Sequence, residues 1–79
     1  SRPASARDIL DSETSAECVR KAVGELPLKY REVLAMAYFG DHEYKEIAET
    51  LGITVTNVET RIYRAKKLLR ELVREEMDG

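Results

Sequence analysis

The sequence predicts an all-α fold, a compact domain of four helices that contains a helix-turn-helix. Apolar residues recur at intervals of three and four along most of the chain. Residues typical of helix starts and stops divide this pattern into four stretches, and no segment alternates as a strand does. The 79 residues suffice for one small domain with one core, and we expect helices near 14–24, 27–39, 43–51 and 55–76.

The first two helices are marked by their starts and by one apolar face each. Thr14, followed three residues later by Glu17, forms a capping box, which indicates a helix start. The second helix starts at Pro27, since proline in a first turn needs no N–H partner, and Gly40 with Asp41 ends its pattern. The two apolar faces consist of Cys18, Val19, Ala22 and Val23, then Tyr30, Val33, Leu34, Ala37 and Tyr38.

The third and fourth helices are spaced for a helix-turn-helix. This motif needs a small residue at the helix crossing, a residue that tolerates positive φ in the turn, and a branched apolar residue in the second helix. Ala48, Gly52 and Val58 meet these needs, although Gly52 would also fit an ordinary helical hairpin. Thr54 is placed to cap the fourth helix. The apolar faces of both helices consist of Tyr44, Ile47, Ala48, Leu51, Val55, Val58, Ile62, Ala65, Leu69, Leu72 and Val73.

The composition argues against several functional classes. With one cysteine and one histidine the chain offers neither a disulfide nor a thiolate metal site, and a hydrolytic triad would depend on His42. We therefore expect no enzyme, no catalytic residue, no metal, no cofactor and no small-molecule substrate. Without a membrane-length apolar run or a signal segment, we expect a cytoplasmic protein with no membrane partner. Residues 1–11 read as a linker or a cloning remnant, and residues 12–79 as the domain.

Charge is distributed unevenly. The formal net charge is −2, to which residues 1–53 contribute −3 and residues 54–74 contribute +4. The charges of the second segment are those of Arg61, Arg64, Lys66, Lys67, Arg70 and Arg74 against Glu59 and Glu71. An acidic body with one basic segment is expected where a single element meets a polyanion, although a solvated helix face would explain these charges equally well.

The exposed face of the fourth helix carries side chains that suit a DNA major groove. Successive residues lie about 100° apart, so the residues opposite the apolar stripe can be assigned from the sequence. Arginine can pair with guanine and asparagine with adenine, whereas threonine and tyrosine can meet bases or phosphates. The residues on this face are Thr56, Asn57, Thr60, Tyr63, Arg64 and Lys67.

Several short motifs between residues 25 and 72 form a known pattern in combination. They are Leu26-Pro27, the run from Tyr30 to Leu34, the run from Tyr44 to Glu49, Leu51-Gly52-Ile53, Val58, Thr60-Arg61 and Arg64-Ala65. The segment resembles the C-terminal domain, region four, of bacterial RNA polymerase sigma factors, and most of all the extracytoplasmic-function class. The resemblance implies a last helix that reads the −35 element of double-stranded promoter DNA. It also implies docking on the flap of the β subunit of RNA polymerase core and often capture by an anti-sigma factor.

The resemblance also implies two sets of DNA-contacting positions. The base-reading positions are Glu59, Thr60, Tyr63 and Arg64. The positions that contact the DNA backbone are Tyr44, Lys45, Thr54, Thr56, Arg61 and Lys67. Glu59 departs from the family pattern, in which a basic residue is common. A glutamate cannot hold a phosphate, but it can accept a hydrogen bond from a cytosine amine, or it can lie off the DNA.

Two other interpretations share this four-helix plan. The output domain of LuxR-type response regulators usually carries a threonine in place of Pro27, and a Val-His pair where this chain has Arg61 and Ile62. An interaction module that does not read DNA is the second alternative, and the acidic first half of the chain together with Glu59 favours it.

Overall fold

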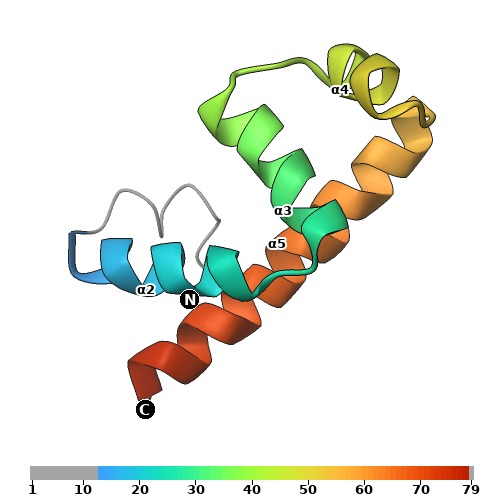
Figure 1. Ribbon diagram of the computed structural model, residues 1–79. Coiled ribbons are helices and arrows are strands. Elements are labelled where there is room, and N and C mark those ends of the chain that lie inside the picture. The colour runs from blue at the N-terminus through green and yellow to red at the C-terminus, as the bar shows by residue number, and fades with distance from the viewer. Residues whose placement is uncertain (1–12, 79) are drawn as a thin grey trace, which may run out of the picture.

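The computed structural model describes residues 13–78 as a succession of helices (Figure 1). The elements are α2 (Glu13–Glu25), α3 (Leu28–Leu34), the π-helical turn η1 (Ala35–Phe39), α4 (Tyr44–Leu51) and α5 (Val55–Asp78). No strand occurs within the described range, and the predicted all-α class is confirmed. The predicted linker at 1–11 lies outside the described residues, as does the side chain of Thr14, which was predicted to cap the first helix.

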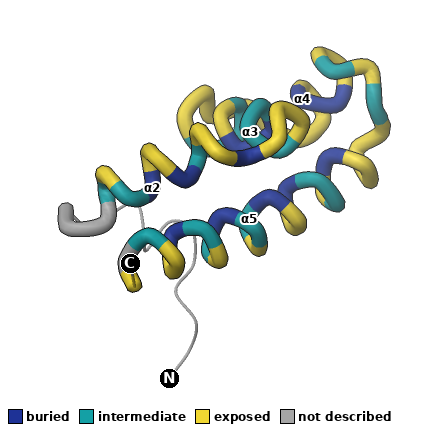
Figure 2. The backbone as a smooth tube through the Cα atoms, turned by 60° about the horizontal axis from the view of Figure 1, so that its bottom comes forward, coloured by how far each residue is buried: buried dark blue, intermediate teal, exposed yellow. Residues whose placement is uncertain are grey.

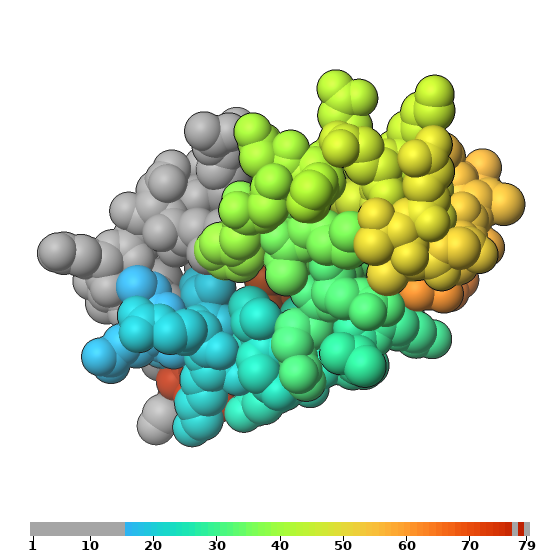
Figure 3. Space-filling view, turned by 45° about the horizontal axis from the view of Figure 1, so that its top comes forward, coloured from blue at the N-terminus to red at the C-terminus, as the bar shows by residue number. Residues whose placement is uncertain are grey.

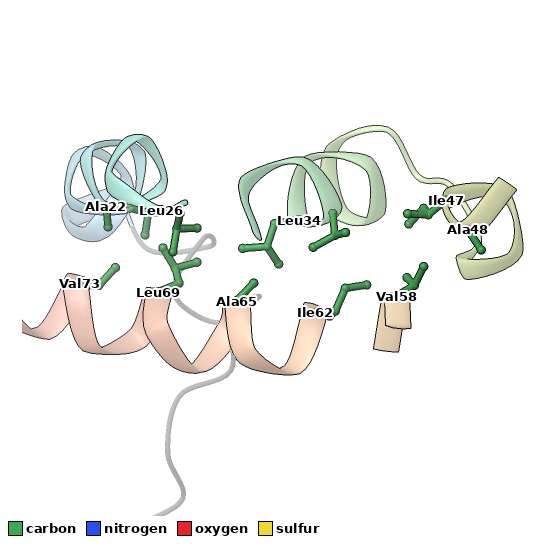
Figure 4. Packing of buried hydrophobic residues seen from close by; sticks show 12 residues of the cluster. Ala22, Leu26, Leu34, Ile47, Ala48, Val58, Ile62, Ala65, Leu69 and Val73 are labelled. Atoms are coloured by element: carbon green, nitrogen blue, oxygen red, sulfur yellow. The ribbon is translucent and has the colours of Figure 1, made fainter. Parts of the chain in front are cut away.

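The long helix α5 is the element against which α2, α3 and α4 all pack. Figure 2 shows its buried residues along the side that faces the other helices and its exposed residues on the opposite side. Near the start of α5, Val58 lies against Ile47 and Ala48 of α4, and near its end Val73 lies close to Ala22 of α2 (Figure 4). The predicted stripe is confirmed for the buried residues Val58, Ile62, Ala65, Leu69 and Val73.

An arginine from α3 holds the joint between α2 and α3. The Nη2 atom of Arg31 donates hydrogen bonds to the carbonyl oxygens of Gly24 at 3.2 Å and Leu26 at 3.0 Å. Leu26 itself is only 1% exposed, so the residue before Pro27 is a core residue, which the periodicity did not predict. Lys21 of α2 and Glu76 of α5 add an ion pair of 3.2 Å.

The second helix does not continue to residue 39 with uniform geometry. Its last turn widens into η1, in which the Gly40 N–H donates to the Ala35 carbonyl oxygen, five residues back, at 2.9 Å. The chain then turns through Asp41, whose φ is +54°. A Cβ on Gly40 would come within 2.8 Å of the exposed His42 ring and 3.1 Å of the Met36 carbonyl oxygen, so a larger residue there would displace the imidazole.

Two residues of the predicted apolar faces lie at the surface, although Tyr44 was also predicted to contact the DNA backbone. Val55 is 39% exposed and Tyr44 is 37% exposed. Both are first residues of their helices, α5 and α4, where a helix has only begun to pack on its neighbours. The prediction was therefore wrong for Val55 as a core residue, whereas exposure leaves Tyr44 available to a partner.

Candidate DNA interface

The turn between α4 and α5 has the geometry of a helix-turn-helix. Gly52 adopts φ +68° and ψ +35°, the left-handed conformation that ends many helices. Its N–H and that of Ile53 both point to the carbonyl oxygen of Ala48, the latter at 3.0 Å. Ala48 is 6% exposed and Val58 is fully buried, as the motif requires. The three predicted motif residues therefore have the expected roles.

The start of α5 is fixed by Thr54. Its Oγ1 accepts a hydrogen bond from the Asn57 N–H at 3.0 Å, and its carbonyl oxygen accepts one from the Val58 N–H at 3.0 Å. The N–H groups of Val55 and Thr56 have no carbonyl acceptor within the helix, because they belong to its first turn. Such free N–H groups favour an anion such as a phosphate.

The start of α4 is held by a reciprocal glutamate pair. The Oε1 of Glu46 accepts a hydrogen bond from the Glu43 N–H at 3.0 Å. Glu46 also lies 3.7 Å from Nδ1 of His42. The hydrogen bond from the Glu43 backbone, and then the neighbouring His42, hold the pKa of Glu46 below its usual value. Glu43 thus acts in a capping box, and Tyr44 and Lys45 are presented at an ordered helix start.

Of the predicted base-reading residues, Thr60, Tyr63 and Arg64 lie on the outer face of α5, and Glu59 lies at the edge of that face, about 40° around the helix from Tyr63. Glu59, Tyr63 and Arg64 are exposed, with Tyr63 at 66%, and Thr60 is partly buried. Among residues 16–76, neither Glu59 nor Arg64 has an ion-pair partner within 4.0 Å. Asn57 is also exposed on the first turn. This face and its edge thus carry carboxylate, hydroxyl, phenol, amide and guanidinium groups whose side chains form no ion pair or hydrogen bond with another described residue.

The predicted backbone-contacting residues divide into two groups. Those exposed at the surface are Tyr44, Lys45, Thr54, Thr56 and Lys67. Arg61 differs, because its side chain is only 29% exposed and its Nη1 lies 4.0 Å from Oε1 of Glu32 in α3. The side chain of Lys66 also points toward the second helix, because its Nζ lies 5.1 Å from the ring centroid of Tyr38 in η1. Arg61 therefore lies at the border between the exposed outer face of α5 and the side that faces α3.

A second surface feature lies on the α2 side of the molecule. Phe39, which is 68% exposed, forms an apolar groove of about 280 Å³ with one side of α2. The α2 residues that line it are Ala16, Val19, Arg20 and Val23. Figure 3 shows α2 at one end of this view and α4 with the start of α5 at the other. Sequence periodicity did not predict the groove, because it depends on how η1 places Phe39.

The described residues, 13–78, contain neither a cluster of metal-ligating side chains nor a helix suited to crossing a membrane. No three side chains among His, Cys, Asp and Glu gather there in a way that could hold a metal ion. None of these helices combines the length and hydropathy that a bilayer crossing demands.

Comparison with known proteins identifies the family. Residues 16–69 match the family described as Sigma-70, region 4. Two Bacillus subtilis relatives are RNA polymerase sigma factor SigV, 38% identical over 60 residues, and ECF RNA polymerase sigma factor SigW, 34% identical over 68 residues. These alignments cover 75% and 86% of this chain but 36% of each relative, so the chain spans about a third of their length. No solved structure matches. With its helix-turn-helix geometry and this match over most of its length, the chain belongs to the sigma-70 region 4 family of DNA-binding domains.

Proposed function

We propose that this domain reads the −35 element of a promoter with the first half of α5. The observation that supports the proposal is the outer face of that half, where Tyr63 and Arg64 are exposed beside the partly buried Thr60. The α4–α5 turn fixes this face relative to the core, so little ordering of the backbone is needed on binding. An α-helix fits the major groove, where arginine and asparagine can distinguish bases.

Phosphate contacts are proposed on both sides of this face. Tyr44 and Lys45 at the start of α4, together with Thr54 and Thr56 at the start of α5, supply exposed donors at two helix N-termini. Lys67 adds an exposed cation farther along α5. Because the whole chain has a net charge of −2, we expect modest affinity with a strong dependence on salt.

Arg64 provides the sharpest test of DNA reading. Duplexes selected from a randomised pool by the wild-type domain would be titrated at low salt and followed by fluorescence anisotropy. We expect Arg64→Ala to weaken binding to the selected duplex by about tenfold or more, and binding to unrelated duplexes by much less. Arg74→Ala removes the same charge from an exposed position near the end of α5 and serves as the matched control. Equal losses on both duplexes for Arg64→Ala would contradict base reading.

We propose that the groove between α2 and Phe39 docks on the flap of the RNA polymerase β subunit. Its support is an exposed aromatic ring beside apolar α2 residues, away from the start of α5, so that DNA and polymerase could be held together. Isotope-labelled domain would be titrated with the flap-tip segment while amide shifts are recorded by NMR. We expect saturable shifts at Val19, Val23 and Phe39, and weaker binding by Phe39→Ala.

Leu28→Ala is the control for this titration, because Leu28 is 66% exposed but does not line the groove. Shifts centred on the outer face of α5 would contradict the assignment of the groove. A further proposed partner, which the family resemblance implies, is an anti-sigma factor that would compete with DNA or with the flap segment. A polymerase-bound role would also place the chain in the cytoplasm, and it requires no chemical step, cofactor or metal.

A further inference from the structure

Glu59 is an exposed acid with no partner among the residues that the structure describes. Among residues 16–76, no cation lies within 4.0 Å of its carboxylate, and no hydrogen bond to it is formed. Its neighbours one helical turn away are Val55 and Thr56 on one side and Ile62 and Tyr63 on the other. None of these four carries a positive charge, so helical pairing cannot explain the glutamate.

Glu59 has no evident role in stabilising α5 either. Acidic residues favour a helix when they lie in its first turn, and Glu59 is the fifth residue of α5. The first turn is instead served by Thr54. Between Val55 and Arg70, Glu59 is the only acidic residue, in a segment that otherwise attracts phosphate. The negative charge of Glu59 therefore opposes DNA binding and does not stabilise the folded domain in exchange.

We propose that Glu59 selects a cytosine in the major groove by accepting a hydrogen bond from its N4 amino group. This inference rests on the proposed function, because it requires the side of α5 that carries Glu59 and Tyr63 to meet base edges in the groove. Carboxylate oxygens only accept hydrogen bonds, and cytosine presents an amine donor in the groove. Adenine presents its amine beside the N7 acceptor, which repels a carboxylate, whereas guanine and thymine present acceptors.

The negative charge makes the selection stricter. A carboxylate brought among phosphates without a donor loses hydration and gains repulsion. At the base pair that it faces, Glu59 would thus reject three of the four bases as well as favour one. The exposed Arg64, which lies five residues farther along α5 and on a different side of the helix from Glu59, can pair with a guanine elsewhere in the site, so the domain retains a favourable contact of its own.

The test compares base preferences of four forms of this chain. Wild type, Glu59→Ala, Glu59→Gln and Glu71→Ala would each select binding sites from randomised duplexes at low salt, after circular dichroism shows equal helicity. Glu71→Ala removes the same charge from an exposed position on the far half of α5. In wild type we expect one position at which cytosine is preferred by at least about fivefold.

The variants should change that one position in different ways. With Glu59→Ala we expect the cytosine preference to fall below about twofold while the other positions keep theirs. With Glu59→Gln we expect the preferred base to become adenine, because an amide can pair with both N6 and N7. Glu71→Ala should keep every wild-type preference.

The outcomes separate this inference from the proposed function. A wild-type motif that Glu59→Ala leaves unchanged would overturn the role of Glu59 and leave DNA reading intact. Loss of preference at every position in Glu59→Ala would also overturn it, because a single base contact cannot do this. Failure of the wild type to select any motif would overturn both proposals.

Discussion

The Thr54 hydroxyl accepts the backbone N–H of Asn57 at 3.0 Å, and this single bond fixes where α5 begins. Because Asn57 lies on the same turn as Thr56, the cap also sets the orientation of the residues that enter a groove first. The helix start is therefore both a stability element and part of the candidate interface.

Replacing Thr54 tests this cap. We expect Thr54→Ala to lower the free energy of unfolding by about 1 kcal/mol, because the Asn57 N–H loses its acceptor. Thr54→Ser keeps the hydroxyl and should retain most of the stability. Urea unfolding followed by circular dichroism measures both, and an unchanged midpoint for Thr54→Ala would contradict a role for the cap.

Gly52 and Gly24, where an added Cβ would meet no atom within 4 Å, should respond to alanine in opposite directions. Gly52 has a φ of +68°, so Gly52→Ala forces a side chain into the left-handed region and should cost about 1–2 kcal/mol. Gly24 lies inside α2 without positive φ, and a Cβ there meets nothing within 4 Å. Gly24→Ala should therefore stabilise the domain by about 0.5–1 kcal/mol. Thermal unfolding of the two variants in parallel gives the comparison, and equal shifts would argue against strain at the turn.

The stability of the folded domain should depend on pH through the carboxyl group of Glu46. Its pKa in the folded domain is below the ordinary glutamate value of 4.5, because the Glu43 N–H and His42 favour the charged carboxylate. A carboxylate whose pKa is lower in the folded than in the unfolded protein stabilises the folded state at pH values above the unfolded-state pKa. This stabilisation is lost as the pH falls through the folded-state pKa. Glu46→Gln, which keeps an acceptor but no charge, should therefore show a shallower loss of stability between about pH 5 and pH 3.

The control for this titration is Glu49→Gln, an exposed residue of the same helix that makes no side-chain hydrogen bond within residues 16–76. Its unfolding midpoints in urea should follow those of the wild type across the pH range. If the unfolding midpoints of Glu46→Gln also follow those of the wild type across the pH range, the Glu46 carboxylate does not contribute to the pH dependence of stability.

The pair between Arg61 and Glu32 should restrain DNA binding slightly. Glu32→Gln removes the acid that lies 4.0 Å from Arg61, and we expect DNA affinity at low salt to rise about two- to fivefold. Stability should change by less than about 1 kcal/mol, as is usual for exposed ion pairs. Titrations by fluorescence anisotropy should show no gain from Glu32→Gln once Arg61→Ala is present. Glu25→Gln, which changes the net charge equally at an exposed site, separates a local effect from a general one.

Periodicity and turn residues were sufficient to predict the four helices and the helix-turn-helix, because α5 buries a regular stripe from Val58 to Val73. These patterns failed to predict burial where the position of a residue along the chain mattered more than the side of the helix on which it lies. Val55 lies on the apolar side of α5 but is its first residue, where the other helices do not cover it. Leu26 is buried although it belongs to the connection between α2 and α3.

The candidate DNA interface was predictable as a helix face, but its individual contacts were not. An ion pair such as that of Arg61 with Glu32 joins residues far apart in sequence, so no local pattern indicates it. The widened turn at η1 likewise has no sequence signal comparable to a proline or a glycine cap. The groove at Phe39 follows from that turn and was missed with it.

The length of α5 has a mechanical consequence. Its 24 residues make a rod of about 36 Å that passes from the helix-turn-helix at one end to α2 at the other. A lever of that length turns a rotation of about 10° at the α2 end into a movement of about 6 Å at the other. A partner that binds α2 and rotates the domain by this amount would therefore shift the start of α5 by roughly two base-pair spacings along DNA, without contacting α5 itself.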